Sequence, residues 1–269
     1  MCVFSFACAL VTDSPSIPSL PPRVSLLGFP IDCVTQQQTL DHIAASIRAG
    51  QGGWVLTPNL DILRRVTSEP DTRALVEGTT LRTADGMPLI WASRLKGTPL
   101  PQRVTGSDLI FTLTQRAAKD GFRVYLLGGD PGVGDAAAAR LRDLFPGLQI
   151  AGVESPPFGF DKDDAYMHAM RERVIAASPD IVYVAVGFPK QERVIAFLRP
   201  ALPASWFLGI GISFSFVTGH VQRAPRLVQK LGLEWVHRMA QEPGRLAKRY
   251  LVHGIPFAVK LLLLSALRR

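Results

Sequence analysis

The chain has 269 residues, of which 47% are hydrophobic and 19% charged, and its net charge is +8. A chain of this length and apolar content can bury one large core, or one core with an appendage, and we expect disorder only at its ends. The three cysteines, Cys2, Cys8 and Cys33, are an odd number without C-x-x-C spacing. They support neither a disulfide framework nor a cysteine-based metal site, and they fit a reducing cytoplasm.

Residues 1–22 are expected to form a disordered leader. Their apolar start has no basic residues before it and is far shorter than the roughly 20 residues that span a bilayer. It runs into a stretch rich in Ser and Pro that ends at Pro22. A cleaved signal peptide is the alternative interpretation.

Residues 23–219 are predicted to form an α/β catalytic domain, because short β-rich segments alternate with helical ones. The expected strands are 24–28, 54–57, 79–83, 123–129, 149–153, 180–187 and 205–211, and the helical stretches between them include 35–49, 107–119, 135–145, 163–177 and 191–198. Nearly continuous apolar strands such as IVYVAV indicate a mostly parallel, Rossmann-like sheet flanked by helices. Ligands of such sheets gather where strands end and helices begin.

Residues 220–269 are predicted to form a basic amphipathic helical appendage, since strand signals stop after Gly211. This segment holds ten Lys/Arg against two acids, which accounts for the whole net charge. Basic side chains interleaved with aromatic and aliphatic ones favour an anionic membrane surface as partner. Nucleic acid is the rival partner, but no zinc-ligand spacing, RNP-like motif or Arg-rich recognition helix supports it.

An ordinary solvated helix face is the third interpretation of this segment. Four charged residues stand four apart, as in an ion-pair ladder: Arg226, Lys230, Glu234 and Arg238. The final apolar run, Phe257 to Leu267, is expected to be too short to cross a bilayer. It can lie on a membrane or pack on the body.

Polar clusters follow four of the expected strands. They begin at Thr57 and Asn59, at Asp85, at Gly187 with the following P-K-Q-E turn, and at Gly209 with Gly211. Capping and turn formation explain any one cluster. Four clusters at one sheet edge favour a binding site.

A glycine-rich turn at residues 128–134 also joins a strand to a helix. The amide groups from Gly128 and Gly129 onward can hold a diphosphate. The turn lacks G-x-G-x-x-G spacing, and Pro131 removes one amide donor. An NAD-dependent oxidoreductase therefore remains only as an alternative.

Several motifs occur in a fixed order from about Val24 to Tyr250: ADGMP, PQRVTGSDL, LLGGDPGV, SPDIVYVAVGFPKQE, GIG and RAPRLVQKLGLEWVHRMAQEPGRLAKRY. Together they resemble the WecG/TagA/CpsF glycosyltransferases. The resemblance implies an inverting, metal-independent transfer of a sugar from a UDP-sugar to a polyprenyl-diphosphate-linked saccharide. The sugar would be N-acetylmannosamine, its uronic acid or glucose. The enzyme would act in cell-surface polysaccharide synthesis, as a peripheral protein on the cytoplasmic face of the membrane.

The resemblance also implies roles for particular residues. Asp85 would be the base, with a capping Asp as the alternative, and Thr57 and Asn59 would hold sugar or acceptor hydroxyls. Gln191 would bond the donor and Arg103 would steady its diphosphate, unless Arg103 only lies at a domain edge. The rest of the expected donor site is Gly128, Gly129, Gly187, Lys190, Glu192, Gly209 and Gly211. In the appendage the lipid diphosphate or the leaving UDP would meet Arg238, Arg245 and either Lys248 or Arg249.

No cofactor or metal ion is expected. The only D-x-D is Asp161-Lys162-Asp163, followed by Asp164, and acids at a helix start are explained by capping and the helix dipole. Metal ligation is the alternative. Two non-enzymatic readings, a peripheral membrane scaffold and a nucleotide-sugar sensor, keep the basic tail without needing Asp85, and formation of a homo-oligomer is left open.

Overall fold

A six-stranded parallel sheet forms the centre of the protein. The computed structural model describes residues 17–267, apart from the side chains of Arg226, Lys230 and Arg245, so most of the expected leader lies outside the described residues. The strand order is β4-β3-β8-β7-β5-β6, with β3 (Gly53–Leu56), β4 (Leu81–Arg82), β5 (Arg123–Gly128), β6 (Gln149–Glu154), β7 (Ile181–Ala185) and β8 (Trp206–Gly209). The predicted α/β class is confirmed.

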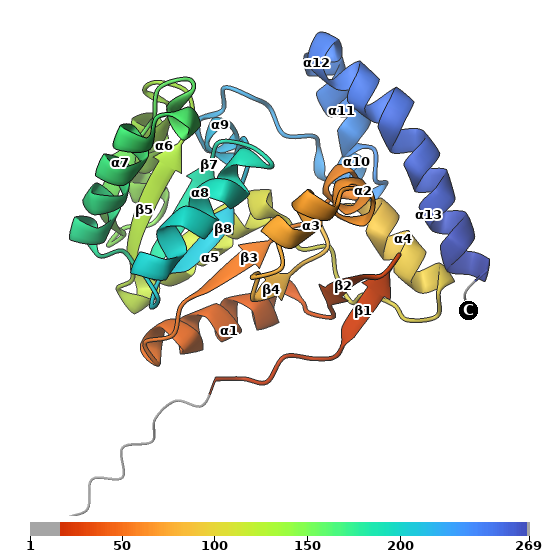
Figure 1. Cartoon of the computed structure of the whole chain (residues 1–269), viewed down its shortest axis with the longest axis horizontal. Coiled ribbons are helices and arrows are strands. Elements are labelled where there is room, and N and C mark those ends of the chain that lie inside the picture. The colour runs from red at the N-terminus through yellow and green to blue at the C-terminus, as the bar shows by residue number, and fades with distance from the viewer. Residues whose placement is uncertain (1–16, 268–269) are drawn as a thin grey trace, which may run out of the picture.

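Helices cover both faces of this sheet (Figure 1). In β7 the side chains of Ile181 and Tyr183 pack on one face, in a core shared with α1 (Gln36–Arg48), α5 (Gly106–Asp120), α6 (Val133–Leu144) and α9 (Ser213–Thr218). Val182 and Val184 pack on the other face, against α7 (Asp164–Ala177) and α8 (Lys190–Leu198). Both faces are therefore buried, as continuous apolar strands require.

The expected strand at 24–28 lies outside the main sheet. β1 (Arg23–Leu26) and β2 (Phe29–Asp32) form a separate antiparallel hairpin. Asp32 anchors it, because its carboxylate accepts from the backbone N of Arg82 at 2.7 Å and pairs with Arg23 at 2.8 Å. Preceding residues also contact the body, since Leu20 packs against the core and the carbonyl of Pro18 lies 3.0 Å from His42 Nδ1.

The hairpin belongs to a third apolar cluster, which joins both ends of the chain. This cluster contains Leu26 of β1, Leu63 of α2 (Leu60–Ser68), Leu89 of α4 (Met87–Leu95) and Leu261 near the C-terminus. The short α3 (Pro70–Leu75) follows α2. The C-terminal helix is thus a core element along one face.

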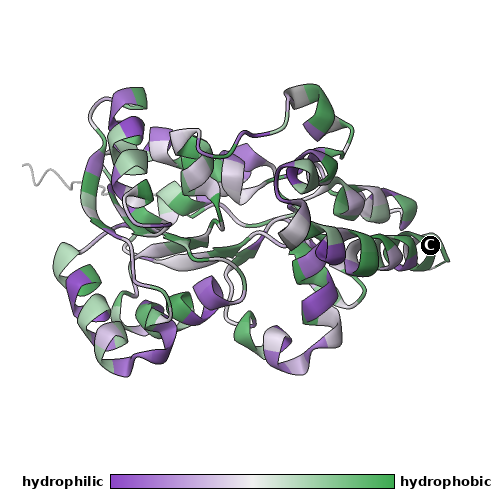
Figure 2. Cartoon of the chain, turned by 90° about the horizontal axis from the view of Figure 1, so that it is seen from above, coloured by the Kyte–Doolittle hydropathy of each residue, from purple (hydrophilic) through white to green (hydrophobic). Residues whose placement is uncertain are grey.

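The appendage is helical, as predicted. It consists of α10 (Arg226–Lys230), α11 (Glu234–Gln241), α12 (Pro243–Ala247), the π-helical η3 (Lys248–Gly254) and α13 (Ile255–Leu267). The helix breaks between α10 and α11 at Gly232, so the alternative of an ion-pair ladder along one helix is wrong. The α13 ribbon runs beside α4 in Figure 1, and it is hydrophobic along most of its length in Figure 2.

The expected length of the final apolar helix was also wrong. η3 and α13 form one helix of 20 residues, Lys248–Leu267, which is long and apolar enough to cross a membrane by length and composition. The run from Phe257 to Leu267 is only the second part of this helix, because the helix begins with η3 at Lys248. Leu261 and Ser265 are nevertheless buried, so one face of this helix packs against the body.

Gly232 sets the distance between the appendage and α4. Its φ is +72°, and an added Cβ would lie 2.8 Å from the Trp91 ring and 2.9 Å from Met87 Cβ. We expect Gly232→Ala to destabilise the fold by about 1–3 kcal/mol, through overpacking and a strained left-handed backbone. Thermal unfolding measures the loss, and acrylamide quenching of tryptophan fluorescence reports whether Trp91 becomes more exposed.

Gly244 provides the matched control. It lies in α12, and nothing lies within 4 Å of an added Cβ. Gly244→Ala should leave stability unchanged or raise it slightly, because alanine favours a helix. Equal losses in the two variants would contradict this account of the junction.

Candidate active site

A cavity of about 360 Å³ lies between the body and the appendage. It opens beside the carboxyl ends of β3 and β4, where the sequence predicts a site. Its polar lining comes from Asn59, Asp61, Asp85, Arg103, Thr105, Ser107, Arg223, Gln229, Glu234, Arg238 and Arg249. Its apolar lining includes Trp91, Phe216, Trp235, Tyr250 and Leu262. Both parts of the chain therefore build the site.

Asp85 lies at the end of β4 and lines this cavity. Its backbone N donates to the carbonyl of Pro58 at 2.9 Å, which ties the ends of β3 and β4 together. Gly86 is the N-cap of α4, so Asp85 does not cap this helix. Within residues 17–267 its carboxylate has no hydrogen-bond or ion-pair partner among the contacts found. The side chain is free to take part in chemistry.

The surroundings of Asp85 favour its neutral form. Burial raises the pKa of its carboxyl from 3.8 to about 7. Among nearby charges, Arg103 and Arg223 lower this pKa, whereas Glu234 and Asp108 raise it. Near neutral pH the group is therefore close to half ionised, which suits a group that accepts and releases a proton.

Thr57 and Asn59 follow β3. Thr57 is buried, and its Oγ1 lies 3.5 Å from the position of a Cβ added at Gly106. Asn59 is the N-cap of α2, where its Oδ1 accepts from the backbone N of Asp61 and of Ile62, each at 3.0 Å. Asn59 lines the cavity and Thr57 does not. Capping thus engages Oδ1 of the Asn59 side-chain amide.

Gln191 and Glu192 lie buried beneath the end of β8. Gln191 Oε1 accepts from the backbone N of Gly211 at 3.1 Å, and its Nε2 donates to Glu192 Oε1 at 2.9 Å. A Cβ added at Gly209 would lie 2.4 Å from Gln191 Nε2, so this glycine admits the Gln191 side chain. Burial raises the pKa of Glu192 to about 7. Through its hydrogen bond to Gly211, the buried Gln191 side chain stabilises the turn after β8.

The other expected donor-site residues lie farther along the same sheet edge and do not line the cavity. Lys190 forms an ion pair with Asp161 at 3.0 Å. A Cβ added at Gly128 would lie 2.6 Å from the carbonyl oxygen of Ala185, which explains the glycine there. Gly129, Gly187 and Gly211 have positive φ. The expected residues therefore form two groups along one edge.

The acids around Asp161 have structural partners. Asp161 pairs with Lys190, and Asp163 caps α7 by accepting from the backbone N of Tyr166 at 3.0 Å. Within residues 17–267 no group of three or more His, Cys, Asp or Glu side chains is arranged to hold a metal ion.

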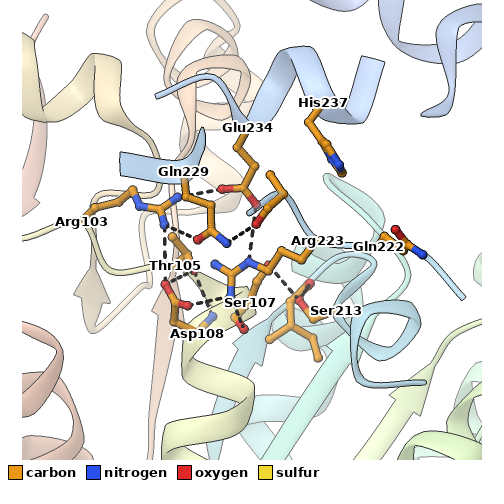
Figure 3. A network of polar contacts seen from close by, with 12 residues as sticks. Arg103, Thr105, Ser107, Asp108, Ser213, Gln222, Arg223, Gln229, Glu234 and His237 are labelled. Carbon is orange, nitrogen blue, oxygen red and sulfur yellow. Dashed lines mark hydrogen bonds and ion pairs between the residues drawn. The ribbon is translucent and has the colours of Figure 1, made fainter. Parts of the chain in front are cut away.

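Four side chains of alternating charge form a closed ring (Figure 3), and all four act on the charge of Asp85. Arg103 Nη1 lies 2.9 Å from Glu234 Oε2, and Arg223 Nη1 lies 2.7 Å from Asp108 Oδ1. Two longer pairs close the ring, Arg223 to Glu234 at 3.5 Å and Arg103 to Asp108 at 3.9 Å. Arg103 Nη2 also donates to Gln229 Oε1 at 3.1 Å. Arg103 is thus placed at the site, held by the appendage.

Two of the expected appendage cations also line the cavity. Arg238 lies over the Phe216 ring, 5.8 Å from its centroid, and Arg249 pairs with Asp61 at 3.1 Å. Lys248 is exposed at the start of η3. The side chain of Arg245 lies outside the described residues. Among the described side chains, four guanidinium groups therefore line the cavity that contains Asp85, which can bind an anionic group beside a base.

Sequence reasoning missed Asp108, Arg223 and Glu234 as site residues. They occur in the motifs GSDL, RAPR and GLEW, but nothing in the local pattern pairs them with Arg103.

The model of the glycosyl transferase WecG/TagA/CpsF family matches residues 24–269. The match covers the body and the appendage alike.

The raised pKa of Asp85 has a consequence for stability. Because the folded protein holds a proton that the unfolded chain releases above about pH 4, ionised Asp85 destabilises the fold as the pH rises toward 8. Asp85→Asn should therefore stabilise the protein at pH 8, by about 1–3 kcal/mol after allowance for partial solvent contact, and have little effect at pH 4. Thermal unfolding at both pH values measures this.

Asp143 offers the control, because it is exposed on α6. Asp143→Asn should shift the melting temperature little at either pH. A gain for Asp85→Asn that is the same at pH 4 and pH 8 would show that ionisation of Asp85 is not the cause.

Proposed function

Because the chain belongs to the WecG/TagA/CpsF glycosyltransferase family, we propose that it moves a hexosyl group from a UDP-sugar to a polyprenyl-diphosphate-linked saccharide. Its family is one of transferases of cell-surface polysaccharide synthesis. We propose inversion at the anomeric carbon, with N-acetylmannosamine, its uronic acid or glucose as the sugar. The family match gives no support to the alternative of an NAD-dependent oxidoreductase.

Asp85 in its charged cavity is the observation that carries this proposal. A carboxylate with a pKa of about 7 and no hydrogen-bond or ion-pair partner among the described residues can take the proton of an acceptor hydroxyl. The hydroxyl oxygen then bonds to the anomeric carbon, and the bond between that carbon and the diphosphate oxygen breaks. The electron pair leaves with UDP.

The guanidinium groups support the departure of the diphosphate. Arg103, Arg223, Arg238 and Arg249 line the same cavity as Asp85, and arginine forms strong, often bidentate bonds to phosphate. We propose that they stabilise the charge of the leaving group, so that transfer needs no metal ion. Gly187 and Gly211 lie along the same edge with open space above them, which supports placing the rest of the donor there.

Transfer from a panel of UDP-sugars to a lipid-linked acceptor tests the proposal. Asp85→Asn should lower kcat by about 10² to 10⁴, the range for loss of a general base. In the unchanged protein kcat/KM should rise with pH through about 7, because only ionised Asp85 accepts a proton. A scaffold or a sensor would give no turnover with any donor.

Glu192 needs its own variant, because its pKa is also about 7. Glu192→Gln should retain the rise of kcat/KM with pH. If that rise disappears in Glu192→Gln, or if Asp85→Asn retains full turnover, Asp85 is not the base. Turnover should persist in EDTA, and a loss that Mg²⁺ or Mn²⁺ restores would refute the metal-independent step.

An exposed apolar stripe on the C-terminal helix supports membrane association. It consists of Leu251, Ile255, Val259, Leu263 and Leu267, which stand four apart and are 43–80% exposed. Residues four apart are neighbours on a helix surface, so the stripe runs along the helix while winding slowly around it, and Ile255 and Val259 also border the cavity. Lys248 and Lys260 are exposed on the same helix. Because another face packs on the body, we propose that the helix lies in the interface of the cytoplasmic leaflet.

Two substitutions in the stripe test this placement. Leu263→Glu with Leu267→Glu should release the protein from liposomes of anionic lipid, because carboxylates would replace the apolar surface that enters the interface. Binding of the unchanged protein should weaken with salt. Sedimentation with liposomes measures both effects. Leu144→Glu, at an exposed leucine on α6, is the control and should bind normally; equal binding by the double variant would disprove the placement.

A further inference from the structure

The ring of Arg103, Asp108, Arg223 and Glu234 joins the body to the appendage. Arg103 and Asp108 belong to the body, whereas Arg223 and Glu234 follow α9 in the appendage. Their side chains are only 17–29% exposed, so each charge depends on its neighbours for compensation. We infer that Glu234 is a positioning residue that holds the Arg103 and Arg223 guanidinium groups beside Asp85, an inference that rests on the proposed function.

Glu234 is the member of the ring that lies in the appendage and pairs with both arginines. Its two carboxylate oxygens face different partners, Oε2 toward Arg103 Nη1 and Oε1 toward Arg223 Nε. Without this carboxylate, Arg223 keeps its close pair with Asp108 at 2.7 Å. Arg103 keeps only the Gln229 amide and the 3.9 Å pair with Asp108. Loss of Glu234 therefore frees Arg103 first.

Glu234 also acts on the base through charge. The charged groups that influence Asp85 come from both parts of the chain, Arg103 and Asp108 from the body and Arg223 and Glu234 from the appendage. Farther along the cavity wall lie Asp61, Arg238 and Arg249. Glu234 opposes ionisation of Asp85 directly, and it neutralises Arg103, which favours that ionisation. Both effects raise the pKa of Asp85.

The test is Glu234→Gln, which keeps the side-chain shape and removes the charge. We expect kcat/KM at pH 8 to fall about tenfold or more, because the arginines lose their alignment. The rise of kcat/KM with pH should move to lower pH by about half a unit or more, because Asp85 loses a negative neighbour and faces an uncompensated Arg103. Glu172→Gln, at an exposed glutamate on α7, is the matched control and should change neither.

Acrylamide quenching separates positioning from simple fastening of the appendage. Trp91 and Trp235 line the cavity, whereas Trp54 and Trp206 are buried in the body. A shifted pH profile supports the inference, with or without greater quenching. Greater quenching with an unshifted profile shows that Glu234 only fastens the appendage, and overturns it. An unchanged profile with unchanged quenching overturns it too.

A measurement without turnover distinguishes this inference from the proposed function. The stability gain from Asp85→Asn grows from about pH 4 and levels off near the pKa of Asp85 in the folded protein, so the pH at which the gain levels off should be lower in the Glu234→Gln background, and the gain itself smaller. Absence of transfer with every donor would refute the proposed function, while an unmoved stability profile refutes the action of Glu234 on Asp85. If Glu234→Gln does not fold, Glu234→Asp keeps the charge but shortens its reach. Its kcat/KM should fall with the profile near its original pH, and full activity would overturn the inference.

Discussion

The site depends on the packing of α13 against α4, because this contact holds the appendage over the carboxyl edge of the sheet. Leu261 is fully buried at the contact, and Gly232 lets the chain between α10 and α11 approach the Trp91 ring. The cavity wall opposite Asp85 comes from residues that this contact positions. Apolar burial supplies the attachment, and the charged ring sets the orientation of the side chains.

The two groups of expected site residues differ in what their polar side chains contact along the sheet edge. Beside β3 and β4, polar side chains line an open cavity, and polar atoms such as the Asp85 carboxylate remain able to form hydrogen bonds. Beneath β8, the side chains of Gln191 and Glu192 hydrogen-bond to each other, and Gln191 also accepts from the backbone N of Gly211. Rigid strand ends are a sound base for a site, since a reacting group must be held within a fraction of an ångström.

Much of the fold could be predicted from the sequence because its signals are local. Continuous apolar runs marked the strands of the sheet, and Thr35 and Asp163 marked helix starts at which both side chains accept from the backbone. Helices α2, α3 and α4 are not among the expected helices; α3 and α4 carry Pro70 and Pro88 in their first turns, where proline fits a helix without breaking it. Asp85 was found because a Gly-flanked acid after a strand is a local pattern, strengthened by the family resemblance.

The charged ring could not be predicted in this way. Arg103 and Glu234 are 131 residues apart, and no periodicity relates them. The sequence instead suggested that Glu234 pairs with neighbours four residues away. Only the docking of the appendage shows that Glu234 turns toward the body, because that choice depends on tertiary packing.

The third apolar cluster has a consequence for synthesis of the protein. Leu26 and Leu261 share this cluster, and β3 pairs with β8, whose residues come more than halfway along the chain. The sheet cannot be completed until β8 has left the ribosome, and the cluster cannot be completed until α13 has left it. The cavity therefore lacks part of its wall until α13 has emerged, and α13 is also the segment that we propose to lie at the membrane.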